Sequence, residues 1–407
     1  MEFFGKFQQN AELSYRQLYQ RFNWFLKIAL LRVFDDDFLV TPMSTVIFYF
    51  YATQISISLT AVILHVIRYR DDIDSVILSV SAFVSALELV LKLIGMVLRR
   101  KQIVQMINSV LNDRSDQAGP IEAAIYGKYL RLASMTSLEV IVACGEILRV
   151  LHRKLLYVTI VSYLTAGAML LLYPVVTGKI GKRILAVGFS VPFVDYHRDP
   201  WYLINYVLQV VQIQWIALLF IGLDGPFYLF VCYSASQLEI LIVYLRRIGD
   251  CPDNVQEQRQ LIRKVFNIHM NLSNFLAKCS NVYREVYLKQ VFCSIVHICV
   301  SLFHIQLKFN NGSYGMLLTN VNKMWLFCYC GQLVVSKAAE FGASVYANYW
   351  YQLWNRHDLQ DILFMLCNAQ RNYGFSIGGF GYLSFDTFTT ILKTSYSFNA
   401  FLHQVMN

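Results

Sequence analysis

The stretch Gly381–Val405, GYLSFDTFTTILKTSYSFNAFLHQV, is the last apolar segment of the chain and is long enough for a helix to cross a bilayer. Hydroxyl, amide and charged side chains recur through it; they are Asp386, Thr389, Thr390, Lys393, Thr394, Ser397, Asn399 and Gln404. Polar groups are costly in hydrocarbon, so we expect these side chains to face protein or water. The segment therefore predicts either a pore-lining helix or the last helix of a packed bundle, with hydroxyls bonded to their own backbone.

The composition of the whole chain is that of a polytopic membrane protein. Of its 407 residues, 56% are hydrophobic and only 15% are charged, and its mean hydropathy is +0.44. Soluble domains carry roughly 25% charged residues. No catalytic motif or metal-ligand spacing occurs, so we expect neither an enzyme nor a cofactor. The formal charge of +9 is distributed by membrane side, which argues against a nucleic-acid partner.

Seven apolar segments predict an all-α protein with seven transmembrane helices. They are Pro42–Ile67, Ser75–Leu98, Tyr157–Val176, Trp201–Leu223, Tyr287–Leu307, Tyr314–Ser336 and Gly381–Val405. Most Lys and Arg residues fall in the N-terminal segment and after the second, fourth and sixth spans. The positive-inside rule then places the N-terminus in the cytosol and the C-terminus outside the cell. This orientation is opposite to that of G-protein-coupled receptors.

The chain is predicted to comprise four parts. Residues 1–40 form an amphipathic segment at the inner headgroups. Residues 41–240 hold spans one to four, an outer-half ligand pocket, and an outer loop, Gly178–Pro200, that is either a lid or a packed connection. Residues 241–380 hold spans five and six with cytosolic helices, which either assemble subunits or pack only on their own chain. Residues 381–407 form the terminal pore-lining helix.

Several local features carry further predictions. Glu88 and Lys92 lie four residues apart within the second span, which favours a structural ion pair over an ion site. Asp224-Gly-Pro226 is predicted to kink or cap the fourth span at its inner end. Gly374–Gly381, GFSIGGFG, is a predicted hinge before the last span. Asn311 begins an Asn-Gly-Ser sequon in an outer loop and is a predicted glycosylation site.

The outer halves of four predicted spans combine aromatic and methionine side chains with few polar groups. The candidate ligand-binding residues are Phe83, Tyr163, Ala166, Met169, Tyr202, Tyr206, Gln209, Tyr314, Leu317 and Asn320. A closed, mostly apolar pocket of this kind suits a small, volatile, uncharged organic molecule. Such a ligand gains about 25 cal/mol per Å² of buried apolar surface, so shape would govern selectivity. The alternative is that these residues are ordinary core of a helical bundle.

Three segments resemble insect odorant receptors. They are LSFDTFTTILKTSYSFNAFL near the C-terminus, CYCGQLVVSKAAEFGASVYANYWYQL at Cys328–Leu353, and WYLINYVLQ at Trp201–Gln209. The resemblance extends from Leu155 to the end of the chain, whereas the first third matches mainly in hydropathy. Insect gustatory receptors usually close with a Thr-Tyr…Gln-Phe pattern; the sequence Thr394-Ser-Tyr396-Ser in this place favours the odorant branch.

The resemblance implies a ligand-gated, cation-permeable channel of four subunits in the plasma membrane of olfactory sensory neurons. It further implies a volatile ligand in the outer half of each tuning subunit, contact with membrane lipid, and a hetero-oligomer with the shared co-receptor. This chain resembles a tuning subunit, because the co-receptor has a longer connection between spans four and five than Arg246–Lys289.

By position in the resemblance, five residues of the last span are expected to line the pore. Phe401, Gln404 and Val405 match its narrow outer end, and Thr394 and Phe398 lie deeper. Phe401 is bulkier than the small aliphatic residue that is usual there. Two other classes remain as alternatives: a seven-helix G-protein-coupled chemoreceptor, and a secondary transporter, which should show internal repeats that this sequence lacks.

Overall fold

The computed structural model describes residues 15–35, 38–39, 41–70, 73–113, 119–134, 201–250, 255–307, 311–348, 355–371 and 373–406. The predicted third span, Tyr157–Val176, and the outer loop lie outside these residues. In the described part the secondary structure is helical, apart from one isolated bridge between Ser376 and Tyr382. The helices are α2 (Tyr15–Ile28), α3 (Pro42–Arg68), α4 (Ile73–Leu98), α5 (Arg100–Leu111), α6 (Pro120–Ser134), α9 (Trp201–Asp250), α10 (Val255–Leu307), α11 (Asn311–Tyr346), α12 (Arg356–Ala369) and α13 (Phe385–Met406).

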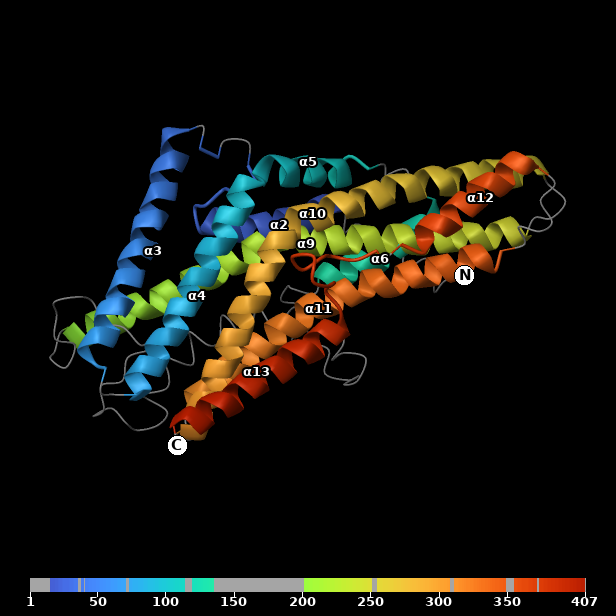
Figure 1. The fold of residues 1–407 in the computed structure, drawn as a ribbon. Coiled ribbons are helices and arrows are strands. Elements are labelled where there is room, and N and C mark those ends of the chain that lie inside the picture. The colour runs from blue at the N-terminus through green and yellow to red at the C-terminus, as the bar shows by residue number, and fades with distance from the viewer. Residues whose placement is uncertain are drawn as a thin grey trace, which may run out of the picture.

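Three helices are too long to be contained in a bilayer. α9 has 50 residues, α10 has 53 and α11 has 36. At 1.5 Å per residue α10 is about 80 Å long, against a hydrocarbon core of about 30 Å. These helices run together as a long arm with α12 at its far end, while the C-terminus of α13 lies at the opposite end of the molecule (Figure 1). The helices α9, α10 and α11 therefore extend beyond the predicted fourth, fifth and sixth spans.

Four described helical segments are long and apolar enough to cross a membrane: Pro42–Arg68, Val76–Leu98, Trp201–Ile248 and Val255–Leu307. Two further predicted spans are helical as well, since α11 contains Tyr314–Ser336 and α13 contains most of Gly381–Val405. α13 begins at Phe385 rather than Gly381, because the Ser384 hydroxyl accepts a hydrogen bond from the Thr387 amide and caps the helix.

Helix α2 packs closely against α9 at two glycines of α9. Its apolar face buries Leu18, Phe22 and Leu26. A Cβ atom added at Gly222 would overlap with Leu26, and one at Gly225 would overlap with Phe22. Close approach of two helices requires small residues at such positions.

The prediction that Asp224-Gly-Pro226 caps the fourth span is wrong, because α9 continues through Pro226 to Asp250, and the alternative of a kink stays a prediction. A helix interior tolerates proline where neighbouring helices satisfy and support the backbone. Gly222 and Gly225 instead allow the close contact with α2, and Asp224 forms an ion pair with Lys92 of α4.

The glycine-rich segment before α13 forms a compact turn held against α10. Gly378 and Gly379 have φ of +63° and +93°, which favour glycine. Arg284 and Gly378 are joined by two hydrogen bonds of 3.0 Å each. The Gly378 amide donates to the Arg284 carbonyl, and the Arg284 guanidinium donates to the Gly378 carbonyl. Phe375 is fully buried against the rings of Phe227 and Tyr287. The predicted hinge is thus a structured turn in this conformation.

The long arm is cross-linked by ion pairs between its helices. Lys128 of α6 lies 2.6 Å from Glu239 of α9, and Lys337 of α11 lies 3.4 Å from the same carboxylate. At the far end Arg259 of α10 lies 3.2 Å from Asp358 of α12. Helices α6 and α12 therefore pack on their own chain, and subunit assembly through the extensions stays a prediction.

Candidate ligand and pore sites

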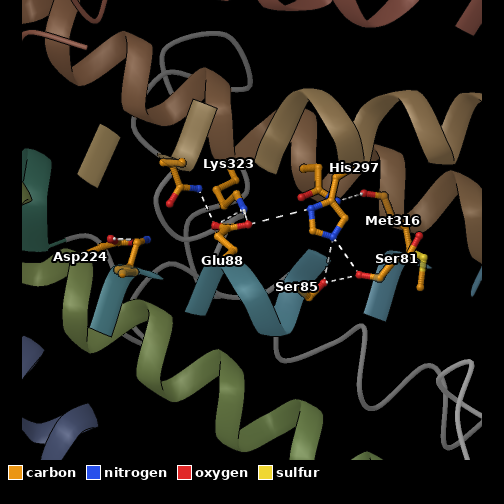
Figure 2. A network of polar contacts seen from close by, with 10 residues as sticks. Ser81, Ser85, Glu88, Asp224, His297, Met316 and Lys323 are labelled. Atoms are coloured by element: carbon orange, nitrogen blue, oxygen red, sulfur yellow. Dashed lines mark hydrogen bonds and ion pairs between the residues drawn. The ribbon is translucent and has the colours of Figure 1, made fainter. Parts of the chain in front are cut away.

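A network of buried polar side chains joins four helices inside the bundle (Figure 2). Glu88 of α4 accepts hydrogen bonds from Lys323 of α11 at 2.7 and 2.9 Å. The Gln290 amide of α10 donates to the same carboxylate at 2.6 Å. All three side chains are buried. A buried charge is stable only with a partner in good geometry, and Glu88 has two donors here.

The predicted ion pair between Glu88 and Lys92 is not formed. Lys92 instead donates to both carboxylate oxygens of Asp224 in α9, at 2.7 and 3.0 Å, and its ammonium lies 4.9 Å from the centre of the Phe220 ring. The two residues of α4 point toward different neighbours, Glu88 toward α11 and Lys92 toward α9. Two-oxygen contacts between helices satisfy buried charges better than one contact along a single helix.

His297 of α10 extends this network toward the predicted outer half of the bundle. Its Nε2 atom lies 3.1 Å from the Ser81 carbonyl and 2.9 Å from the Ser85 hydroxyl of α4. Because a carbonyl can only accept, Nε2 carries the proton. Its Nδ1 atom lies 3.9 Å from the Glu88 carboxylate. The imidazole thus stands between the backbone of α4 and the Glu88–Lys323 pair (Figure 2).

The predicted ligand-binding residues fall into three groups. Tyr163, Ala166 and Met169 lie outside the described residues. On α9, Tyr206 and Gln209 are buried, and the rings of Tyr202 and Tyr206 are 5.9 Å apart. These are the predicted residues that the structure brings together.

The remaining predicted ligand residues lie on α4 and α11. Phe83 and Leu317 are half-buried, and Leu317 packs against the hydrophobic core. Tyr314 is exposed at the start of α11. Asn320 donates its amide to the Met316 carbonyl of its own helix at 3.0 Å. Asn311 is the first residue of α11, and its glycosylation stays a prediction.

Sequence reasoning missed a row of polar residues on α10. Gln290, Ser294, His297, Ser301 and His304 recur every three to four residues and are all buried. Within the described residues, the hydroxyls of Ser294, Ser301 and Tyr206 are buried without a hydrogen-bond partner. The signal for this row is the helical spacing of polar residues within an apolar span, which differs from the spacing of metal ligands.

The terminal helix α13 has two contrasting faces. Ile391, Ser395 and Asn399 are buried, and the Ser395 hydroxyl lies 3.5 Å from the Ile295 carbonyl of α10. Asn399 is only 1% exposed and faces protein, on a different face of α13 from the exposed polar residues. It lies one helical turn from Ser395 and so shares its face.

The opposite face of α13 is exposed and largely hydrophilic. Its polar members share one side of the helix; they are Asp386, Thr389, Thr390, Lys393, Ser397 and Gln404. Phe398 and Phe401 are 55% and 60% exposed, and Thr394 is half-buried at the edge. Of the five predicted pore residues, four have described side chains, and the Val405 side chain lies outside them. We call this surface the outward face of α13.

Comparison with known proteins links these features to a family. A family model described as "7tm Odorant receptor" matches residues 72–396. Odorant receptors 47a and 49a of Drosophila melanogaster are 20% and 21% identical over 58% and 52% of this chain. The matched segments span 64% and 54% of those two relatives. Odorant receptor 10 of Aedes albopictus is 20% identical over 61% of this chain and 68% of its own length.

The fold is also similar to solved structures. The insect olfactory receptor OR5 of Machilis hrabei in complex with eugenol aligns with a TM-score of 0.75, covering 96% of this chain and 98% of that one at 12% identity. The structure of OR5 described without eugenol aligns with a TM-score of 0.74. At this identity the likeness shows a shared fold.

Proposed function

Because this chain belongs to the 7tm odorant receptor family, and is thus a membrane receptor rather than an enzyme, we propose that it is a subunit of an odorant-gated, non-selective cation channel. The observation that carries the proposal is the outward face of α13. Its charged and hydroxyl side chains point away from the subunit, although α13 belongs to a bundle of apolar helices.

Energetics favour water or another subunit beside that face. A charged residue in the middle of a membrane helix costs about 2.5–3.5 kcal/mol when it faces lipid. Lys393 would incur this cost if α13 were surrounded by lipid, whereas Asp386 lies in the first turn of α13, at the end of the helix. A water-filled pore between subunits removes it. A single-chain receptor would instead be expected to direct such residues into its own bundle.

The proposal includes assembly with the shared co-receptor into a tetramer in the plasma membrane of olfactory sensory neurons. Tyr346 near the end of α11 and Leu363 and Phe364 of α12 are large apolar side chains exposed on the long arm. Apolar side chains grouped outside the bilayer suit a subunit interface. They support the assembly interpretation of the extensions, beside the packing of α6 and α12 on their own chain.

The proposed ligand is a small volatile organic molecule. The related OR5 of Machilis hrabei was solved with eugenol, a molecule of this class. Tyr202, Tyr206 and Gln209 would form one wall of its pocket, with Phe83 and Leu317 on neighbouring helices. The unpartnered hydroxyl of Tyr206 is suited to bond a ligand oxygen, since a buried hydroxyl gains most from a new partner.

Gating would follow from a population shift between two helix arrangements. α10 contacts both sites: His297 lies against α4 on the ligand side, and the Ile295 carbonyl lies against Ser395 of α13. A shift of α10 would therefore move the pore helix. When the pore is closed, Phe398 and Phe401 would exclude water and so block ions.

Cysteine accessibility along α13 tests the proposal. With the co-receptor present, cysteines at Thr390, Lys393 and Ser397 should react with aqueous thiol reagents during odorant application and change the current. Cysteines at Ser395 and Asn399, on the buried face, are the matched controls and should not react. Complete inertness of the outward positions in an active receptor would refute the pore assignment, and saturable uptake without conductance would favour a transporter.

A further inference from the structure

The outward face of α13 carries two charges without an ionic partner. Asp386 and Lys393 are exposed, and neither forms an ion pair within the described part of the chain. They lie seven residues apart, which is two helical turns, so both are on the same face at about 10 Å separation along the axis. The pair is too far apart to neutralise itself. Each charge therefore needs solvent or ions beside it.

The position of Lys393 excludes the usual solution for a lysine in a membrane helix. Lysines near helix ends extend their side chains to the headgroups. Lys393 lies well inside α13, between Phe385 and Met406. Its side chain spans about 6 Å, or roughly four residues of helix, and its neighbours on this face are Thr390 and Ser397 rather than acids.

We propose that Lys393 is a selectivity-determining residue that disfavours divalent relative to monovalent cations in the open pore. The inference rests on the proposed function, because it requires α13 to face the ion path. A fixed positive charge repels a divalent ion twice as strongly as a monovalent one. At about 6 Å in water the repulsion corresponds to roughly threefold for Na⁺ and roughly tenfold for Ca²⁺. Asp386 acts in the opposite sense and concentrates cations two turns away.

Reversal potentials measured in Ca²⁺ against Na⁺ test this inference in cells that also express the co-receptor. Lys393→Gln should raise the permeability ratio of Ca²⁺ to Na⁺ about threefold, because loss of the charge removes a repulsion of roughly tenfold for Ca²⁺ and roughly threefold for Na⁺. Lys393→Arg keeps the charge and should leave the ratio unchanged. Lys278→Gln removes an exposed charge of α10 in the long arm and is the matched control. The effect of Lys393→Gln should shrink at high ionic strength because salt screens the charge.

Chemical restoration of the charge gives a second measurement that does not depend on expression of the Gln variant. In Lys393→Cys, a cationic methanethiosulfonate should lower the raised permeability ratio toward the wild-type value, whereas a neutral one of similar size should not. An unchanged ratio in both variants, with Thr390→Cys and Ser397→Cys still reactive, would overturn the role of Lys393 but leave the pore assignment intact. Inert cysteines along the whole outward face would overturn both.

Discussion

Lys323 and Glu88 illustrate how a membrane bundle accommodates charge. Each is buried, and each owes its stability to a partner on another helix. Removing one member of a buried pair leaves an uncompensated charge, at a cost of about 3–5 kcal/mol. Removing both leaves no charge to compensate. Residues that pair in this way should therefore show strong energetic coupling.

We predict that Lys323→Met alone strongly lowers surface expression and thermal stability, because among the described residues it leaves the Glu88 carboxylate with Gln290 as its one remaining donor. Glu88→Gln combined with Lys323→Met should recover most of the loss, since no charge remains. Thermal unfolding of detergent-solubilised receptor measures the stability of the single and the double variant, and surface labelling measures their expression. A loss in the double variant equal to the sum of the losses in Glu88→Gln and Lys323→Met alone would show that the pair is not coupled.

Phe401 is the second residue with a defined expected effect. Phe401→Ala should increase resting leak or single-channel conductance, because a smaller side chain excludes less water from a hydrophobic constriction. Patch-clamp recording without odorant measures the leak. Ile391→Ala, on the buried face of the same helix, is the comparison: it should affect stability without changing single-channel conductance. Identical conductance in Phe401→Ala and wild type would place the constriction elsewhere.

At the scale of elements, the close packing of α2 on α9 depends on Gly222 and Gly225 of α9, which have no side chain. The two glycines are three residues apart in α9, so both lie on the face of the helix that contacts α2. The aromatic Phe22 fills the space at Gly225. These contacts fix α2 to α9 through the fit of their surfaces.

Gly225→Val should destabilise the receptor by about 1–3 kcal/mol, because its side chain would overlap with Phe22 and force the helices apart. Gly381→Val is the matched control, since among the described residues nothing lies within 4 Å of a Cβ added there. The difference in melting temperature between the two variants measures the effect. If Gly225→Val melted at the temperature of wild type, the packing of α2 would be compliant at this point.

At the scale of the whole molecule, membrane orientation distinguishes the proposed channel subunit from a G-protein-coupled receptor. Lys and Arg are concentrated on one side of the predicted membrane. An epitope tag at the C-terminus should therefore label intact cells, and one at the N-terminus should label only permeabilised cells. The reverse pattern would contradict the predicted topology and with it the position of Phe401 at the outer end of a pore.

Much of the architecture could be predicted from the sequence because it depends on local patterns. Apolar segments of bilayer length, and helical periodicity that continues beyond them, already indicated the long helices α9, α10 and α11. The motif-bearing terminal segment indicated the family. Proline at position 226 was misleading, because its local preference was overridden by packing within the bundle.

The sequence alone determined that this is a helical membrane protein of the odorant receptor family with a polar last helix. Only the tertiary structure decided which helices pair through Glu88 and Lys92, and which side of α13 turns outward. The physical reason is that periodicity places residues on a common face of one helix, but does not say what that face meets. The contacts that a face makes depend on how its helix is rotated against its neighbours, and packing of the whole bundle sets that rotation.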